Sequence, residues 1–283
     1  MVSGQLSGSL CRGLLLASAA LAHHISSTPP NLADKTSARL LSGQEEKASD
    51  ARNSCPDQIH GPRLLNQIGM ALVRISPYTV WFFTALELIV RIASAFPSSP
   101  AASAVVRMFN ASAPATTVLA SPVTTVYFAA FVAVYIGYRI RTSCFATLGR
   151  HFTFTHTTLS EHQLVKDGPY SIVRHASYSG EVLVRGGTIL MLLAPGGWAY
   201  EFGVIGSRYA NTLSKTVVDA AFGSPFARLA GWVLVFHVCW ATFNTSFLIW
   251  RSSIEDATLK EKFGAEWEAY RKQVPCKFIP YIV

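Results

Sequence analysis

Five long apolar stretches, separated by polar connections, dominate the chain. A helix needs about 20 mostly apolar residues to cross the hydrocarbon core of a bilayer, and each stretch comes close to that length. The stretches are Leu6–Ile25, Ser76–Phe96, Thr116–Tyr138, Glu181–Phe202 and Ala227–Trp250. This pattern predicts an all-α, polytopic membrane protein with about five transmembrane helices.

The connections divide the chain further. Residues 1–25 are expected to form the first transmembrane helix, although an Ala-rich run after Arg12 is also compatible with a cleaved signal peptide. Residues 26–75 mix Pro, Ser, Glu and Lys with little apolar periodicity, which predicts a flexible loop. Residues 76–283 then form one membrane domain, in which residues 251–273 continue the last span as a helix outside the membrane.

Composition and charge support this arrangement. The chain is 50% hydrophobic and only 14% charged, whereas soluble proteins carry about 25% charged residues. Lys and Arg concentrate in residues 26–75, 139–180 and 251–277. Because positively charged connections stay in the cytosol, these three segments are expected to be cytosolic. The five cysteines are scattered without metal-ligand spacing, which indicates reduced or buried residues and no metal site.

A few ionisable residues lie inside the apolar stretches. Glu87 and Arg91 are spaced i, i+4 and are expected to neutralise each other, with substrate access as the alternative. Two interpretations of Arg185 stay open: it extends to the cytosolic interface, or it helps to close a ligand site. His237 is expected to be a core residue.

The densest polar chemistry lies at His162–Gly180, directly before the fourth stretch. This segment holds two His, two Tyr, an Arg and a Lys, and such groups at a membrane boundary are costly and usually functional. Gly168-Pro169 predicts a turn that folds the start of the segment back toward its end. Gly180 and Gly186-Gly187 are expected to let the backbone pass close to a neighbour.

A second polar segment follows the last stretch. Arg251 and Glu255 are spaced i, i+4 and lie on one helix face, where the guanidinium can grip a carboxylate and Glu255 can take an amine or a hydroxyl. A simple surface ion pair is the alternative. Phe263, Trp267 and Tyr270 form an apolar stripe that is expected to pack beneath the site.

These segments together resemble the isoprenylcysteine carboxyl methyltransferase family. The resemblance is carried by His-x-Leu-Val-x-x-Gly-x-Tyr-x-x-x-Arg-His-x-Ser-Tyr-x-Gly from His162, by Arg-x-x-x-Glu-Asp-x-x-Leu from Arg251, and by Phe-Gly-x-x-Trp-x-x-Tyr from Phe263. Leu148–Phe154 is similar to the fungal branch of that family. The resemblance extends from about residue 116 to the end of the chain.

The resemblance implies a cytosolic site between the loop before the fourth helix and the C-terminal helix. It implies that Arg251 binds the substrate carboxylate and is the catalytic residue, and that a second set binds S-adenosylmethionine. That set comprises His162, Gln163, Leu164, Val165, Tyr170, His175, Ala176, Ser177, Tyr178 and Glu255. The implied substrate is a C-terminal S-prenylcysteine of a CaaX-type protein, with its lipid tail among the membrane helices. The implied location is the endoplasmic reticulum membrane, with membrane lipids as the other partners and with no nucleic acid or metal.

Three positions depart from the family pattern. Ala176 stands in place of the usual Pro, Asp256 replaces a second Glu, and Thr155 stands where Gln or Glu is common. Three alternatives therefore remain beside the methylation of a prenylcysteine carboxylate. They are a phospholipid amine methyltransferase, an NADPH-dependent sterol reductase, to which Lys262–Tyr270 is also similar, and a lipid-binding relative without activity.

Overall fold

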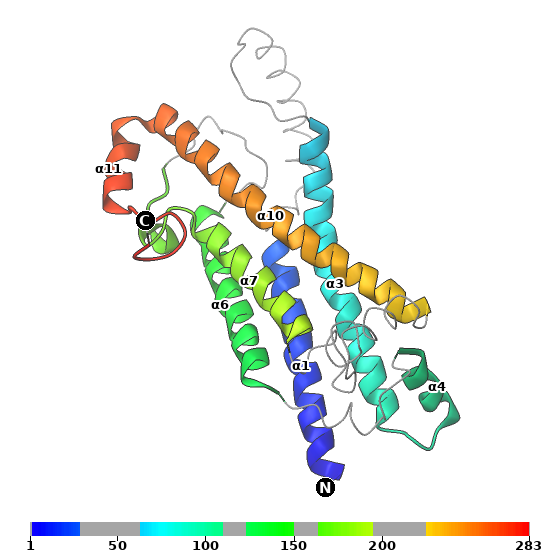
Figure 1. The fold of residues 1–283 in the computed structure, drawn as a ribbon. Helices are drawn as coiled ribbons and strands as arrows, with labels where there is room; N and C mark the ends of the chain where they lie inside the picture. Colours follow the sequence, from blue (N-terminus) through cyan, green and yellow to red (C-terminus); the bar gives the residue numbers. More distant parts are fainter. Residues whose placement is uncertain (1, 29–62, 110–122, 150–163, 195–224, 283) are drawn as a thin grey trace.

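The described part of the protein is built from helices. The computed structural model describes residues 2–28, 63–109, 123–149, 164–194 and 225–282, and its long helices form a bundle (Figure 1). The long helices are α1 (Val2–Ser27), α3 (Arg63–Ser94), α6 (Thr125–Leu148), α7 (Ala176–Leu193) and α10 (Pro225–Phe263). The short ones are α4 (Pro100–Phe109), the 3₁₀ turn η2 (Gly168–Ser171) and α11 (Ala265–Gln273). These residues contain no β-strand beyond an isolated bridge, which confirms the helical class.

Each of the expected spans overlaps one long helix, but the boundaries differ. Helix α3 begins at Arg63 rather than at Ser76. The apolar stretch predicts only the part of a helix that lies in hydrocarbon, and the helix itself can extend beyond it. Two segments, Ile75–Ser94 and Arg228–Phe263, are long and apolar enough to cross a membrane. Both features fit a helical membrane protein, and the number of five spans stays a prediction.

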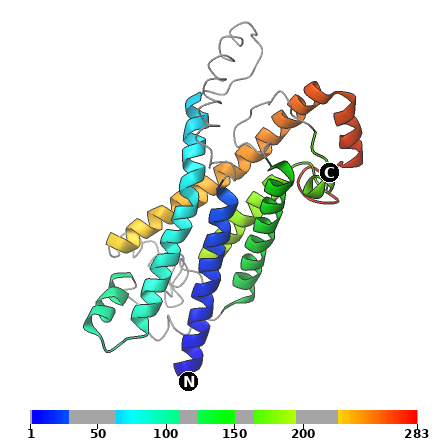
Figure 2. The same ribbon diagram turned by 180° about the vertical axis from the view of Figure 1, so that it is seen from behind.

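Helices α6 and α7 lie side by side in both views (Figures 1 and 2). Glycines permit this close packing, because a Cβ atom at Gly187 would lie 2.6 Å from Val134 Cγ2 and 2.8 Å from the carbonyl oxygen of Ala130. A Cβ atom at Gly180 would likewise lie 2.9 Å from the carbonyl oxygen of Gly137. The expected close approach is therefore confirmed at Gly180 and Gly187. It is wrong for Gly186, where a Cβ atom would meet nothing within 4 Å.

A buried carboxylate joins α7 to α6. Glu181 Oε2 lies 3.1 Å from Arg141 Nε, and its other oxygen accepts a hydrogen bond from Arg185 Nε. Arg141 also donates to the carbonyl oxygen of Ser26 at 2.7 Å, which ties in α1, and Arg185 donates to Ser76 Oγ of α3 at 2.7 Å. Arg185 is buried among the helices, where it contacts Glu181 and Ser76. These contacts fit neither extension to the cytosolic interface nor closure of a ligand site.

Glu87 forms a second buried ion cluster at another level of the bundle. It pairs with Arg91 at 2.9 Å, as the i, i+4 spacing predicts. Arg12 of α1 lies 3.1 Å from the same carboxylate oxygen, a contact that the local pattern does not reveal. His237 is fully buried, as expected, and its Nδ1 lies 2.6 Å from Thr79 Oγ1.

Helix α10 crosses the bundle diagonally and brings its last turns to the end of α6 and the start of α7 (Figure 1). At Gly264, which has a φ of +51°, the chain reverses into α11. A left-handed conformation of this kind favours glycine, because other residues would place a Cβ atom against the backbone. The turn brings α11 and the following C-terminal segment next to η2 and the start of α7 (Figure 1).

Candidate active site

The turn predicted at Gly168-Pro169 is present as η2. Gly168 has a φ of +60°, and a Cβ atom there would lie 2.8 Å from Thr147 Oγ1 at the end of α6. Glycine is thus required both by the backbone conformation and by the lack of space. The turn fixes the path from Leu164 and Val165 to the start of α7.

The C-terminal segment is bound directly to the start of α7. The backbone N–H groups of Arg174 and His175 donate to the carbonyl oxygens of Cys276 and Lys277 at 3.1 and 2.9 Å. Arg174 Nη1 also donates to the carbonyl oxygens of Val274 and Pro275, at 2.8 and 2.7 Å. Sequence reasoning gave residues 274–277 no role in the site, because these contacts join positions about 100 residues apart.

The imidazole of His175 lies between two carboxylates of α10. Its Nε2 is 3.0 Å from Asp256 Oδ1, and its Nδ1 is 3.6 Å from Glu255 Oε2. The ring stacks on Tyr178, with centroids 5.5 Å apart and an interplanar angle of 14°. His175 is buried, so burial, stacking and the bond to Asp256 fix the orientation of its ring.

Glu255 also connects Tyr178 to Arg251. The Tyr178 hydroxyl donates to Glu255 Oε1 at 2.6 Å, and Arg251 Nε donates to the same oxygen at 2.9 Å. The expected i, i+4 pair is therefore present. Binding of a ligand amine or hydroxyl by Glu255 stays a prediction. The side chains of Arg251 and Glu255 retain 20% and 23% of their exposure, so both are accessible to a ligand.

Tyr170 of η2 contacts both α6 and α11. Its hydroxyl is buried beside Cys144, and its carbonyl oxygen accepts a hydrogen bond from the Tyr270 hydroxyl at 2.8 Å. Burial raises the pKa of Tyr170 well above its usual value and raises the pKa of Tyr270 to about 12. Both hydroxyls are therefore protonated donors at neutral pH. Trp267 and Tyr270 of the expected aromatic stripe are buried, whereas Phe263 is only half-buried.

The remaining predicted cofactor residues divide into three groups. Leu164 and Val165 are half-buried and lie outside any helix. Ala176 and Ser177 are buried, and Ser177 accepts a hydrogen bond from Arg141 at 3.1 Å, so its side chain contacts α6. His162, Gln163 and Thr155 lie outside the described residues.

Asp256 is the site residue that sequence reasoning missed. Beyond His175, its carboxylate lies 3.4 Å from Lys277 Nζ and 3.8 Å from Arg174 Nη2. Its position next to Glu255 could have indicated this role. Two neighbouring residues on a helix point to different sides of it, so Asp256 was bound to face other partners than Glu255. Within the described ranges, no group of three or more His, Cys, Asp or Glu residues has the geometry to hold a metal ion.

The fold and the site define a helical membrane protein with a polar centre where α7, α10 and the C-terminal segment meet. Residues 116–205 match the model of the isoprenylcysteine carboxyl methyltransferase (ICMT) family, so this segment is similar to that family. The chain is also 24% identical over 136 residues to the Delta(14)-sterol reductase erg24A of Aspergillus fumigatus. That alignment covers 47% of this chain and 24% of the reductase, so the chain matches about a quarter of that relative. No solved structure matches the chain.

Proposed function

We propose that the protein transfers the methyl group of S-adenosylmethionine to the C-terminal carboxylate of an S-prenylated cysteine in CaaX-type proteins. The observation that carries this proposal is the row of contacts from Tyr178 through Glu255 to Arg251, with distances of 2.6 and 2.9 Å. It sets an accessible carboxylate beside an accessible guanidinium at one surface. The match of residues 116–205 to the ICMT family model supports the same reaction.

The residues present fit the proposed methyl donor. Glu255 Oε2 is 3.6 Å from His175 Nδ1, beyond hydrogen-bond distance, so this oxygen has capacity to accept an ammonium or a hydroxyl of the donor. The half-buried ring of Tyr178, which stacks on His175, offers aromatic surface to a cation. The backbone of Leu164 and Val165 is outside any helix and offers N–H and C=O groups. Together with Tyr170, Ala176, Ser177, His162 and Gln163, these residues form the proposed donor site.

The acceptor chemistry needs no general base. A carboxylate is ionised at neutral pH, because its pKa lies near 4. Bound S-adenosylmethionine supplies an electrophilic methyl group, and its transfer to a carboxylate oxygen leaves a neutral thioether and a methyl ester. The protein therefore has to orient and desolvate the acceptor, which is catalysis by positioning.

Arg251 is the proposed acceptor residue. A guanidinium presents a planar fork of donors that matches a carboxylate, and the bond to Glu255 holds this fork in one orientation. The prenyl chain would lie between the membrane helices, where burial of each CH₂ group is worth about 0.8 kcal/mol. The proposed location is the endoplasmic reticulum membrane with the site facing the cytosol, and the proposed lineage is the fungal branch.

The direct test is a methylation assay on the full chain purified in detergent. Labelled S-adenosylmethionine is supplied with N-acetyl-S-farnesylcysteine, and base-labile methyl ester is measured. We expect ester formation with the prenylcysteine and none with its amidated analogue, which lacks the carboxylate. Methylation of phosphatidylethanolamine instead would show that the acceptor is a phospholipid amine.

The match to a sterol reductase favours a second candidate, an NADPH-dependent reduction of a sterol double bond. A binding titration separates the two, because a methyltransferase binds S-adenosylmethionine and a reductase binds NADPH. Binding of NADPH alone would replace the proposed function with this one. Binding of neither would favour a lipid-binding relative without activity.

A further inference from the structure

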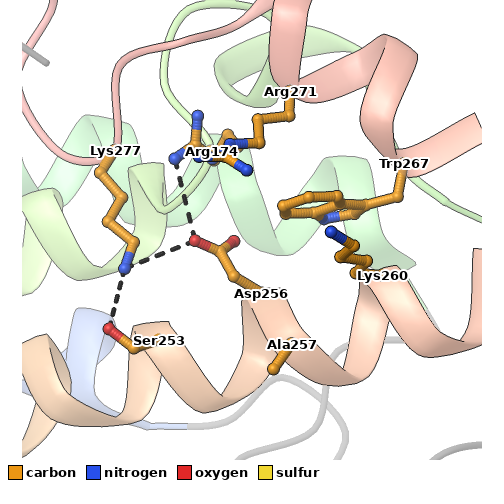
Figure 3. Close-up of a pocket in the computed structure, with 8 residues that line it drawn as sticks. All are labelled: Arg174, Ser253, Asp256, Ala257, Lys260, Trp267, Arg271 and Lys277. Carbon is orange, nitrogen blue, oxygen red and sulfur yellow. Dashed lines mark hydrogen bonds and ion pairs between the residues drawn. The ribbon is translucent and has the colours of Figure 1, made fainter. Parts of the chain in front are cut away.

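A pocket of about 340 Å³ lies on a different face of α10 from Arg251 and Glu255. Figure 3 shows Arg174 and Lys277 converging on Asp256, with Trp267 and Arg271 on the side of α11. The residues that line the pocket are Arg174, Ser253, Asp256, Ala257, Lys260, Trp267, Arg271 and Lys277. Those from α10 repeat at helical spacing and form one face, so this pocket is separate from the proposed methyl-transfer site.

The pocket has an excess of positive charge. Four of its lining residues are cations, and Asp256 is the one carboxylate among the residues that line it. Asp256 is already shared, because Lys277 Nζ lies 3.4 Å away, Arg174 Nη2 3.8 Å and His175 Nε2 3.0 Å. Lys260 pairs with Glu268, which is outside the lining, at 2.7 Å. Asp256 alone cannot neutralise Arg174, Arg271 and Lys277, and the pocket is therefore suited to an anion.

Two buried N–H donors of the lining residues have no acceptor among the residues that the structure describes. They are Nε of Arg174 and Nε1 of Trp267. The side chain of Arg174 is 9% exposed and Trp267 is 3% exposed, so water does not easily reach them. Arg174 is held by its bonds to the carbonyl oxygens of Val274 and Pro275 and cannot turn away. A ligand with acceptor oxygens in the pocket would satisfy both donors.

Exposed apolar side chains follow the pocket residue Lys277 closely in the sequence. They are Ile279, Tyr281 and Ile282, which are 55%, 98% and 62% exposed. Exposed apolar and aromatic residues next to basic ones are typical of a surface that lies in the headgroup region of a membrane. A volume of about 340 Å³ is at the lower end for ligand pockets and suits a phosphate with a small attached group.

We propose that this pocket binds a phosphate group, and that the headgroup of an acidic phospholipid supplies it. Arg174, Lys277 and Arg271 provide the charge, and the indole N–H of Trp267 provides a further donor. The proposal does not depend on methyl transfer. Asp256 contacts His175 of the proposed donor site, but none of the lining residues is proposed to contact the methyl donor or the acceptor.

The test measures the shift of the thermal-unfolding midpoint of the full chain in detergent. One arm adds phosphatidic acid against phosphatidylcholine, and another adds inorganic phosphate against chloride at equal ionic strength. Arg271→Gln and Lys272→Gln are matched variants, because both remove one exposed charge from α11 and only Arg271 lines the pocket. We expect phosphatidic acid to stabilise the protein, with about tenfold weaker apparent affinity in Arg271→Gln and an unchanged affinity in Lys272→Gln.

A shift with inorganic phosphate equal to that with phosphatidic acid, and equally sensitive to Arg271→Gln, would support the phosphate site and overturn the lipid as its source. Equal losses in both variants would overturn the pocket itself, because they would indicate attraction to the overall charge. Absence of any shift in the native chain would also overturn it. Trp267→Phe provides a second check, since loss of the indole N–H should weaken binding while the ring is largely retained.

Discussion

His175 Nε2 lies 3.0 Å from Asp256 Oδ1, and this contact joins the two functional regions of the protein. The face of the same imidazole ring stacks on Tyr178, and the Tyr178 hydroxyl donates to Glu255. Asp256 in turn lines the basic pocket with Lys277. The start of α7, the last turns of α10 and the C-terminal segment are thus held by one shared carboxylate.

Replacing Asp256 by Asn should lower the thermal-unfolding midpoint in detergent. The substitution removes a charge that accepts from His175 and pairs with Lys277, and loss of a charged hydrogen-bond partner costs roughly 1–3 kcal/mol. Glu266→Gln is the control, because it breaks the exposed Lys166–Glu266 pair at 2.8 Å, and such pairs contribute at most about 1 kcal/mol. Similar midpoints for the two variants would mean that Asp256 does not organise the junction.

Replacing Arg251 by Ala should reduce carboxyl methylation about 10- to 100-fold, because charge-assisted hydrogen bonds are worth roughly 1.5–3 kcal/mol. Arg251→Lys should recover only part of the activity, since an ammonium lacks the planar fork. Rates are measured with N-acetyl-S-farnesylcysteine at saturating methyl donor. Full activity of Arg251→Ala would exclude Arg251 as the acceptor residue.

Replacing Glu255 by Gln should raise the KM for S-adenosylmethionine more than the KM for the prenylcysteine. The amide keeps the shape and can still accept from Tyr178, but it loses the charge that attracts a cationic donor. Initial rates with each substrate varied in turn separate the two constants. A larger effect on the prenylcysteine would assign Glu255 to the acceptor side.

Gly187→Ala and Gly186→Ala should differ sharply in stability although the two residues are neighbours. A Cβ atom at Gly187 would lie 2.8 Å from the backbone oxygen of Ala130, whereas one at Gly186 would meet nothing within 4 Å. Gly187→Ala must therefore separate α6 from α7, and overpacking of this kind costs roughly 1–3 kcal/mol. Gly186→Ala should be neutral or stabilising by up to about 1 kcal/mol, because Ala favours helix. Thermal midpoints and monodisperse yield measure both.

Tyr270 should make stability depend on pH in the alkaline range. Burial raises its pKa to about 12, while an unfolded tyrosine titrates near pH 10. Because the folded pKa is the higher one, the contribution of the protonated hydroxyl is complete below about pH 10 and is lost as the pH rises through the folded value. Tyr270→Phe should cost about 1 kcal/mol at neutral pH, through the lost bond to Tyr170, and should flatten the alkaline decline. An unchanged alkaline decline in the variant would exclude this hydroxyl as its source.

Local spacing was sufficient for the features that depend on neighbouring residues. The five apolar stretches each coincide with part of a long helix, and Gly168-Pro169 forms the expected turn. The pairs Arg251–Glu255 and Glu87–Arg91 are present, because residues four apart lie on one helix face whatever the helix packs against. The sequence also placed Tyr178 and His175 near Glu255, through the family resemblance of the two polar segments.

Tertiary packing decided the rest. Arg12 joins Glu87 from another helix, and the C-terminal segment binds Arg174 and His175. Only packing distinguishes Gly187, which contacts α6, from Gly186, which does not. The sequence by itself determined the helices, the turn and the same-face pairs, since these follow from backbone geometry over a few residues. The three-dimensional structure determined the role of Asp256 and the basic pocket, since both require residues distant in the chain to meet, and no local spacing encodes which helix faces become neighbours.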